Sequence, residues 1–270
     1  MVARRPPTFA DACRAVLDDS AGDHAADTTL APIHARTVPE TWGERRAHLV
    51  RTRFPADVER VLELGCGIGA LLGPLSARYD VVGVDDARAY LRFPAARGEA
   101  VVRGRPTDPP VGAAFDAACV LERSAARYGP LDLCVAAYAS LRPGGIAVVA
   151  VPTDPRAVIE PGVETYSGAR YFLERAVDVA GDGTAVVDYR VTDRRTGDAA
   201  VATERRTVAT TSADGLAAAL RTAGFEDVLV SGESDLPGLV VGRGVRPVET
   251  GAAGADLEAL PSGDEEREWE

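Results

Sequence analysis

Lysine is absent from this chain of 270 residues, so all 30 of its basic residues are arginine. This absence excludes a phosphate-binding loop with its lysine, a pyridoxal Schiff-base enzyme and a Tyr/Lys hydride-transfer dehydrogenase. Histidine is scarce, and His24, His34 and His48 all precede the first strand of the predicted sheet. A histidine-based catalytic triad within the sheet domain is therefore excluded as well.

Cysteine is also scarce, and no two of the four cysteines form a CxxC pair: Cys13, Cys66, Cys119 and Cys134. Neither a metal site such as zinc nor a thioredoxin-like redox site is predicted, and we expect reduced, mostly buried thiols. No apolar run approaches the ~18 residues of a membrane span. No apolar stretch follows the amino-terminal arginines, as a secretory signal would require. We expect a cytoplasmic protein with one core and no membrane partner.

Acidic residues exceed basic ones, which gives a net charge of −11. Residues 246–270 carry eight acids and two arginines, a charge of −6 that leaves −5 for the rest of the chain. Their Gly/Ala/Glu/Asp-rich composition predicts an acidic disordered tail. The excess of acid, with arginine in place of lysine, favours a halophilic origin, because acidic surfaces stay solvated in salt.

Residues 61–70 are the most informative stretch, because an apolar run there ends in three glycines. The run predicts a buried strand of a parallel sheet that is covered on both faces. Glu63 interrupts it, and a carboxylate near the carboxyl end of such a strand points toward the ligand crevice. The glycines allow the backbone to approach a ligand closely: Gly65, Gly67 and Gly69.

The spacing of these glycines separates two ligand classes. The dinucleotide fingerprint has its third glycine at the sixth position, where this chain has Ala70. Sixteen residues after Gly69, the run 81–85 predicts a second strand, which ends in an acid suited to a ribose diol, Asp85. A third motif, Leu-Arg-Pro-Gly-Gly at 141–145, precedes an apolar run at 146–151.

In this order and at these distances, the three motifs resemble those of the class I S-adenosylmethionine-dependent methyltransferases of the small-molecule type. The resemblance covers residues 41–152, and residues 211–228 are similar to the last helix of that family and the strand after it. It implies an α/β fold with a Rossmann-like, doubly wound, mostly parallel seven-stranded sheet and helices on both faces. The implied cofactor is S-adenosyl-L-methionine.

The resemblance also implies roles for individual residues. Gly65, Gly67 and Gly69 would contact the cofactor through their backbone, Glu63 would bind its amino-acid end, and Asp85 its ribose hydroxyls. Three further residues border the same site by position: Cys66, Asp86 and Leu121. A surface helix cap is an equal alternative for Asp86. For Cys66 we favour the alternative of a small residue in a tight turn.

One position departs from the family pattern. Where the family often carries an acid near the adenine amino group, this chain has Arg105. Asp108 could substitute for that acid, or backbone and apolar contacts could hold the adenine. The catalytic residue is unknown, with Glu122, after the fourth predicted strand, as a weak candidate. Helix capping or an ion pair with Arg123 is the alternative role for Glu122.

Turn signals and periodicity predict the order of elements. A capping-box pattern at Thr41 predicts a helix to about Arg53. Strands are expected at 60–64, 80–85, 99–103, 115–121 and 146–151, with helices at 68–78, 87–92 and 130–141. Residues 1–40, without a clear period, form an N-terminal extension. The methyltransferase domain spans 41–245, with an inserted meander of three antiparallel strands at about 171–210, after the fifth strand.

Two classes of function follow. The first is methyl transfer to a small-molecule acceptor, with the meander as a wall or lid over the acceptor, or alternatively as a structural flap or dimer surface. The second is a non-catalytic cofactor-fold binding or regulatory protein. A tRNA or protein methyltransferase is a third possibility. Nucleic acid is a disfavoured partner, because the chain has no basic stripe and no Asn-Pro-Pro-Tyr-like motif. The acceptor atom and the oligomeric state stay open at this point.

Overall fold

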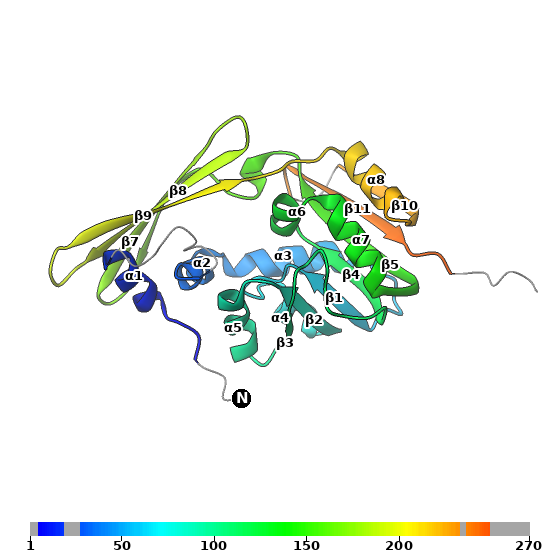
Figure 1. Cartoon of the computed structure of the whole chain (residues 1–270), viewed down its shortest axis with the longest axis horizontal. Helices are drawn as coiled ribbons and strands as arrows, with labels where there is room; N and C mark the ends of the chain where they lie inside the picture. The colour runs from blue at the N-terminus through cyan, green and yellow to red at the C-terminus, as the bar shows by residue number, and fades with distance from the viewer. Residues whose placement is uncertain (1–4, 19–27, 233–235, 249–270) are drawn as a thin grey trace, which may run out of the picture.

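Two sheets organise the protein, as its computed structural model shows (Figure 1). The structure describes residues 5–18, 28–232 and 236–248. The larger sheet has seven strands in the order β10-β11-β5-β4-β1-β2-β3, and only β11 runs antiparallel to its neighbours. This confirms the predicted fold class. The strands are β1 (Arg60–Leu64), β2 (Asp80–Asp85), β3 (Ala100–Arg103), β4 (Phe115–Val120), β5 (Leu141–Pro152), β10 (Glu226–Ser231) and β11 (Leu239–Val245).

Helices cover both faces of this sheet because its strands are apolar on both faces. In β1, Val61 packs on one side against three helices: α3 (Glu40–Arg51), α4 (Leu72–Ser76) and α5 (Arg88–Ala96). Leu62 and Leu64 point to the other face, as the period of two in a strand requires. There they pack against α6 (Glu122–Tyr128), α7 (Pro130–Ser140) and α8 (Ala213–Thr222).

The strand order reverses direction next to β1, which pairs in parallel with β2 on one side and with β4 on the other. Ligands of open α/β sheets bind outside the carboxyl ends of the strands at such a switch point. The carboxyl end of β1 leads into Gly65, that of β2 ends at Asp85, and that of β4 leads into Leu121 and Glu122. The fold therefore gathers the predicted site residues at one edge.

The second sheet is a four-stranded antiparallel meander inserted after β5 and the short 3-10 helix η2 (Pro155–Ala157). Its strands are β6 (Gly162–Ser167), β7 (Tyr171–Val179), β8 (Thr184–Asp193) and β9 (Ala199–Thr207). The prediction of three strands at about 171–210 therefore missed the first of the four strands. The missed strand β6 is exposed along almost its whole length, so its sequence lacks the apolar alternation that marks a half-buried strand.

Two helices from the amino-terminal extension cover one face of this meander: α1 (Phe9–Leu17) and α2 (Ala31–Thr37). The expectation that residues 1–40 have no regular period was wrong for these segments. Thr8 and Asp11 form a capping box at the start of α1, and the helix buries Ala12, Cys13 and Val16. A nine-residue helix is marginal on its own, so packing against the meander supplies its stability.

Three other expected elements differ from the structure. Helix α3 begins at Glu40 after the N-cap Pro39, and no side chain in the described ranges caps it, so the capping box at Thr41 was wrong. Helix α4 is shorter than the expected helix at 68–78, because the positive φ of Gly69 (74°) is incompatible with a helix. Helix α6 was not predicted, because it buries polar residues such as Ser124 in place of an apolar stripe.

Other expectations concern segments or properties that this fold does not test. The predicted acidic tail at 246–270 lies outside the described residues, apart from 246–248. Within the described ranges, no helix has both the length and the apolar character that a membrane crossing requires. The cytoplasmic location and the halophilic origin stay predictions.

The core of the larger sheet can be tested at Leu62, which is fully buried in β1. We expect Leu62→Ala to lower the free energy of unfolding by about 2–5 kcal/mol, because the substitution leaves a cavity between β1 and α7. Leu131→Ala is the matched control, since Leu131 is 41% exposed and should change stability by roughly 0.5 kcal/mol or less. Urea unfolding of the three proteins measures both values, and equal losses would contradict the packing described.

Candidate functional site

The glycine-rich turn after β1 is tied to two neighbouring elements. The backbone N–H groups of Gly65 and Cys66 donate to the Val84 carbonyl of β2, at 2.8 and 3.0 Å. The Ser124 hydroxyl donates to the Gly65 carbonyl at 3.0 Å. A Cβ atom on Gly65 would lie 1.9 Å from Ser124 Oγ, so only glycine fits beside α6 at this position.

Gly67 is the position at which the turn opens. Its φ is +51°, and in the described part of the chain no atom lies within 4 Å of the place that a Cβ would occupy. The Gly67 N–H donates to Asp85 Oδ2 at 2.9 Å, while Asp85 Oδ1 accepts from the Ala87 N–H at 2.9 Å. Asp85 therefore joins the turn to the start of α5 and retains free lone pairs on both oxygens.

Burial raises the pKa of Asp85, and the two backbone hydrogen bonds from Ala87 and Gly67 oppose that shift. Behind the turn, the guanidinium of Arg97 donates to the carbonyls of Ile68 and Gly69 at 2.9 and 3.1 Å. Arg97 also pairs with Glu99. Sequence reasoning missed this support, because neither residue belongs to a motif.

Glu63 is almost fully buried at the carboxyl end of β1, with 3% of its surface exposed. Its Oε2 atom has no hydrogen-bond partner among the residues that the structure describes. Burial raises the pKa of Glu63 to about 8, and the nearby carboxylates of Asp85, Glu99 and Glu122 raise it further in the same direction. A buried polar atom without a partner is costly, so this oxygen is available to accept a hydrogen bond from a ligand.

Glu122 is also buried, with 1% exposed, and it pairs with Arg46 of α3. The Arg46 Nε and Nη2 atoms lie 2.7 and 2.5 Å from Glu122 Oε1, while Glu122 Oε2 has no hydrogen-bond partner in the described ranges. The expected ion pair with Arg123 was therefore wrong in its partner. The guanidinium of Arg46 stacks on the Trp42 ring, 4.2 Å from its centroid.

The remaining predicted site residues differ in their burial and in their contacts. Cys66 is buried, and its Sγ packs beneath Gly83, which supports the reading of a small residue in a tight turn. Leu121 is buried at the N-cap of α6. Asp86 lies 4.0 Å from Arg127 and does not cap α5. Arg105 is exposed in a turn with Asp108, and no interaction in the described ranges joins it to the glycine-rich turn.

A second polar cluster joins four elements around His34 of α2. His34 Nδ1 lies 2.5 Å from the Tyr90 hydroxyl of α5, and His34 Nε2 lies 2.9 Å from the Tyr189 hydroxyl of β8. Arg206 Nη2 lies 3.0 Å from the same Nε2 atom, and Glu204 pairs with both His34 and Arg206. This cluster, defined as His34, Tyr90, Tyr189, Glu204 and Arg206, attaches the meander and α2 to the larger sheet.

Burial lowers the pKa of His34, despite its hydrogen bond with Glu204, which acts in the opposite direction. Burial would raise the pKa of Glu204, but hydrogen bonds with His34 and Arg206 lower it to about 2. The cluster therefore holds a neutral imidazole beside an ionised Glu204–Arg206 pair. Sequence reasoning missed it, because its members come from four separate segments.

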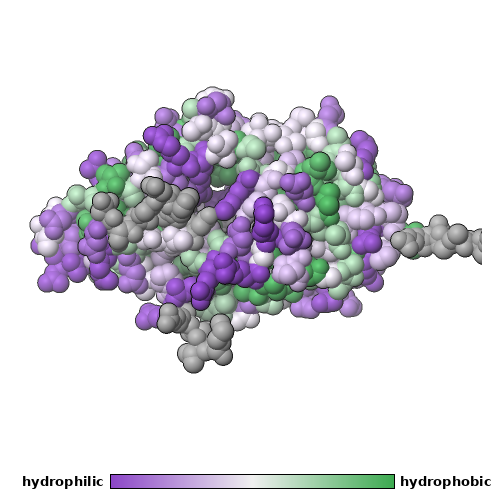
Figure 2. Space-filling model, in the orientation of Figure 1, coloured by the Kyte–Doolittle hydropathy of each residue, from purple (hydrophilic) through white to green (hydrophobic). Residues whose placement is uncertain are grey.

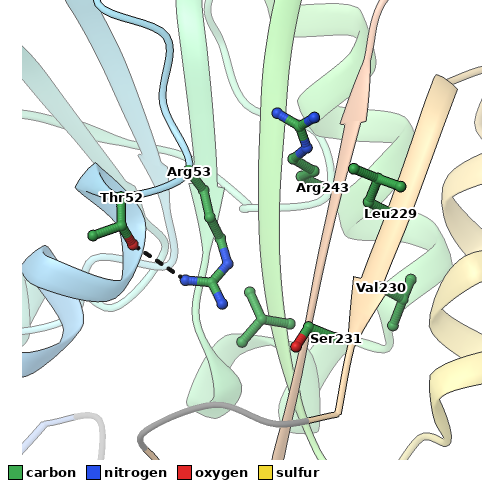
Figure 3. A pocket seen from close by; sticks show the side chains of 7 residues that line it. Thr52, Arg53, Leu229, Val230, Ser231 and Arg243 are labelled. Carbon is green, nitrogen blue, oxygen red and sulfur yellow. Dashed lines mark hydrogen bonds between the residues drawn. The ribbon is translucent and has the colours of Figure 1, made fainter.

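The surface between the two sheets is hollowed, and hydrophilic side chains gather around the hollow (Figure 2). A pocket of about 380 Å³ lies elsewhere, against β10 and β11, lined by Thr52, Arg53, Leu229, Val230, Ser231, Val241 and Arg243 (Figure 3). None of its lining residues belongs to the glycine-rich turn. In the described ranges, no group of three or more His, Cys, Asp or Glu side chains could hold a metal ion.

Solved methyltransferases that depend on S-adenosylmethionine share this fold. KedS8, a sugar N-methyltransferase from Streptoalloteichus, is 22% identical with a TM-score of 0.63, over 80% of this chain and 91% of KedS8. CalS10, an amino pentose methyltransferase from Micromonospora echinaspora, is 23% identical with a TM-score of 0.61, over 80% of this chain and 95% of CalS10.

DesVI from Streptomyces venezuelae is 20% identical with a TM-score of 0.62, over 82% of this chain and 98% of DesVI. No protein-family model matches the chain. A comparison with curated protein sequences finds no match either. At these identities, the likeness demonstrates a common fold.

The neutral state of His34 can be tested by measuring how the stability of the fold depends on pH. Because the folded pKa lies below the unfolded value of about 6.5, the folded protein binds fewer protons, and stability is lost as pH falls below that value. The stability advantage of the native protein over His34→Gln should therefore shrink between about pH 6.5 and pH 5.

Unfolding in urea at several pH values measures this difference. His48→Gln is the control, because it is the same substitution at an exposed position on α3. A pH-independent difference for His34→Gln would contradict the neutral, buried imidazole.

Proposed function

We infer that this chain is an S-adenosylmethionine-dependent methyltransferase that acts on a small-molecule acceptor. The observation that carries the proposal is the unpartnered, buried Oε2 atom of Glu63 beside the open position at Gly67, at the switch point of the sheet. A ligand with a positive charge would stabilise the ionised form of Glu63, which burial and the neighbouring carboxylates otherwise disfavour. S-adenosylmethionine carries such charges on its amino group and its sulfonium.

The residues present fit the parts of this cofactor. The unpartnered oxygens of Glu63 and Glu122 can accept hydrogen bonds from its ammonium group. Arg46 is positioned to bind its carboxylate, since it already pairs with Glu122 at the same place. Asp85 can accept from the ribose hydroxyls with its remaining lone pairs, and Gly67 leaves room for close backbone contact. Roles for Gly65, Gly69, Cys66, Asp86, Leu121 and Arg105 toward the cofactor stay predictions.

When bound, S-adenosylmethionine supplies an activated methyl group on its sulfonium. The chain then has to hold the acceptor in line and exclude water, and positioning of this kind can contribute about 7 kcal/mol or more to barrier reduction. A general base is required only for an acceptor that is protonated at working pH. Glu122 stays a weak candidate, because one of its oxygens is occupied by Arg46.

The hollow between the two sheets is the proposed acceptor site, with the meander and α2 as its outer wall (Figure 2). Two proteins with this fold are a sugar N-methyltransferase and an amino pentose methyltransferase. Amino sugars are therefore the first compounds to test as acceptors.

The cofactor site is tested by calorimetric titration of S-adenosylhomocysteine. We expect the native protein to bind it, and Asp85→Asn to weaken binding by about ten- to 100-fold, because hydrogen bonds to a charged group contribute about 1.5–3 kcal/mol. Asp80→Asn is the control, since Asp80 is exposed at the other end of β2.

Absence of binding by well-folded native protein would contradict the proposal. Binding of the cofactor without turnover across a wide panel of acceptors would favour the non-catalytic alternative.

Glu63 makes the proposal testable by proton release. With a pKa of about 8, Glu63 is mostly protonated at pH 7 and becomes ionised when an ammonium group binds beside it. Binding should therefore release up to one proton per molecule at pH 7, and affinity should rise with pH up to the pKa of the α-amino group, roughly 7.8.

Calorimetry in two buffers of different ionisation enthalpy measures the release. Glu63→Gln should abolish it, whereas Glu59→Gln, at an exposed position beside β1, should leave it unchanged. Proton release that persists in Glu63→Gln would assign it to another group.

A further inference from the structure

We propose that the acceptor carries a negatively charged oxyanion group, a phosphate or a carboxylate, and that Arg123 of α6, beside Trp42, binds this group. The inference rests on the proposed function, because it concerns the second substrate of the same site. Three observations carry it: the pairing of the nearby arginines, the fixed orientation of Arg123, and the balance of charge around it.

Arg123 differs from its neighbours in having no carboxylate partner among the residues that the structure describes. Arg46 is held by Glu122, with both atoms of the contact buried, and Arg206 is held by Glu204. In the described ranges, Arg123 makes neither a hydrogen bond nor an ion pair, and its one interaction there is with an aromatic ring. A guanidinium presents five donors in a fork that matches an oxyanion, and here that fork is free.

Trp42 holds this free guanidinium in place. Arg123 lies over the Trp42 ring at 5.5 Å from its centroid, and Arg46 lies over the same ring at 4.2 Å. The ring thus fixes two guanidinium groups, one engaged and one available. Stacking of this kind orients a guanidinium without using its N–H donors. Arg123 is therefore prepared to bind an anion with little further loss of side-chain freedom.

Among the residues that the structure describes, the charges around Arg123 leave a surplus of one positive charge. Desolvation by neighbouring groups lowers the pKa of Arg123, and the charges of Arg206 and Arg46 act in the same direction, against the attraction of Glu122. Three guanidiniums meet two carboxylates here, Glu122 and Glu204, while His34 is neutral.

The location of Arg123 favours a role in binding the acceptor and not the cofactor. Arg123 is next in sequence to Ser124, whose hydroxyl holds the Gly65 carbonyl, so it borders the proposed cofactor site. The charged groups that act on Arg123 also include Tyr90 and Arg206, which belong to the cluster that attaches the meander. Arg46, more deeply buried, is the better partner for the carboxylate of the cofactor. Arg123 is therefore next to a residue that holds the glycine-rich turn and is within electrostatic reach of the cluster around His34.

The experiment uses the intrinsic fluorescence of Trp42. The chain has two tryptophans, so Trp269→Phe leaves Trp42 as the single reporter beside Arg123. Inorganic phosphate, and separately acetate, is titrated at constant ionic strength into this protein saturated with S-adenosylhomocysteine. We expect a saturable change in fluorescence, and a loss of affinity of about tenfold or more in Arg123→Ala, because hydrogen bonds to charged groups are strong.

Two further variants provide a control and a conservative substitution. Arg205→Ala is the matched control, because Arg205 is exposed on β9 and neighbours Arg206 in sequence, so it should behave as the parent protein does. Arg123→Lys should bind phosphate with intermediate affinity, because it keeps the charge and loses the fork. The preference between phosphate and acetate identifies which oxyanion the acceptor carries.

The outcomes separate this inference from the proposed function. Binding of S-adenosylhomocysteine without a saturable response to phosphate or acetate would overturn the inference and leave the proposed function in place. A response that Arg123→Ala retains would also overturn it. Competition between phosphate and S-adenosylhomocysteine, with weaker cofactor binding in Arg123→Ala, would assign Arg123 to the cofactor instead. Failure of the cofactor itself to bind would overturn both.

Discussion

The burial of Glu63 beside three other carboxylates is the constraint around which the site is built. Asp85, Glu99 and Glu122 all disfavour the ionised form of Glu63, at a place where little water screens their charges. The protein compensates these three with backbone N–H groups or arginines. Glu63 and Glu122 each keep one oxygen without a hydrogen-bond partner among the described residues, but of the two only Glu122 forms an ion pair there, with Arg46. The glycine-rich turn, α3 and α5 are all held in position by this compensation.

The compensation also explains why the turn is shaped as it is. Asp85 accepts from Gly67 and Ala87, so one carboxylate fixes both the turn after β1 and the beginning of α5. Arg97 performs the corresponding task from behind, where it holds two carbonyls of the turn. Backbone groups that cannot pair within a strand or helix are thereby satisfied. A turn held in this way keeps the open position at Gly67 available without closing over it.

On the opposite side, arginine supplies the charge that the site presents to its surroundings. Glu63 and Asp85 lie at the carboxyl ends of β1 and β2, whereas Arg206 lies on β9 of the meander and repels Arg123 of α6. Such a division suits a reaction between a cationic methyl donor and an anionic acceptor, because each is attracted to its own side. The cluster around His34 keeps the two sides at a fixed separation, since it bonds α2 and α5 to β8 and β9.

The sequence alone predicted those strands and helices whose residues have both an apolar periodicity and a turn signal beside them. The strand run before Gly65, the acid at Asp85 and the Pro-Gly-Gly turn before the central part of β5 identified the sheet, because buried parallel strands must be apolar throughout. The same reasoning failed for α6 and β6, whose sequences have little apolar periodicity of their own, and it overlooked the apolar face of α1, which packs against the meander.

The sequence by itself thus determined the fold class and the edge of the sheet at which a ligand binds. Only the tertiary structure decided which charges meet there. Arg46 and Glu122 are 76 positions apart, and His34 and Arg206 are 172 apart, so no local pattern can report their pairing. The identity of a partner depends on how helices and sheets pack across long loops of chain. That packing is a property of the whole molecule.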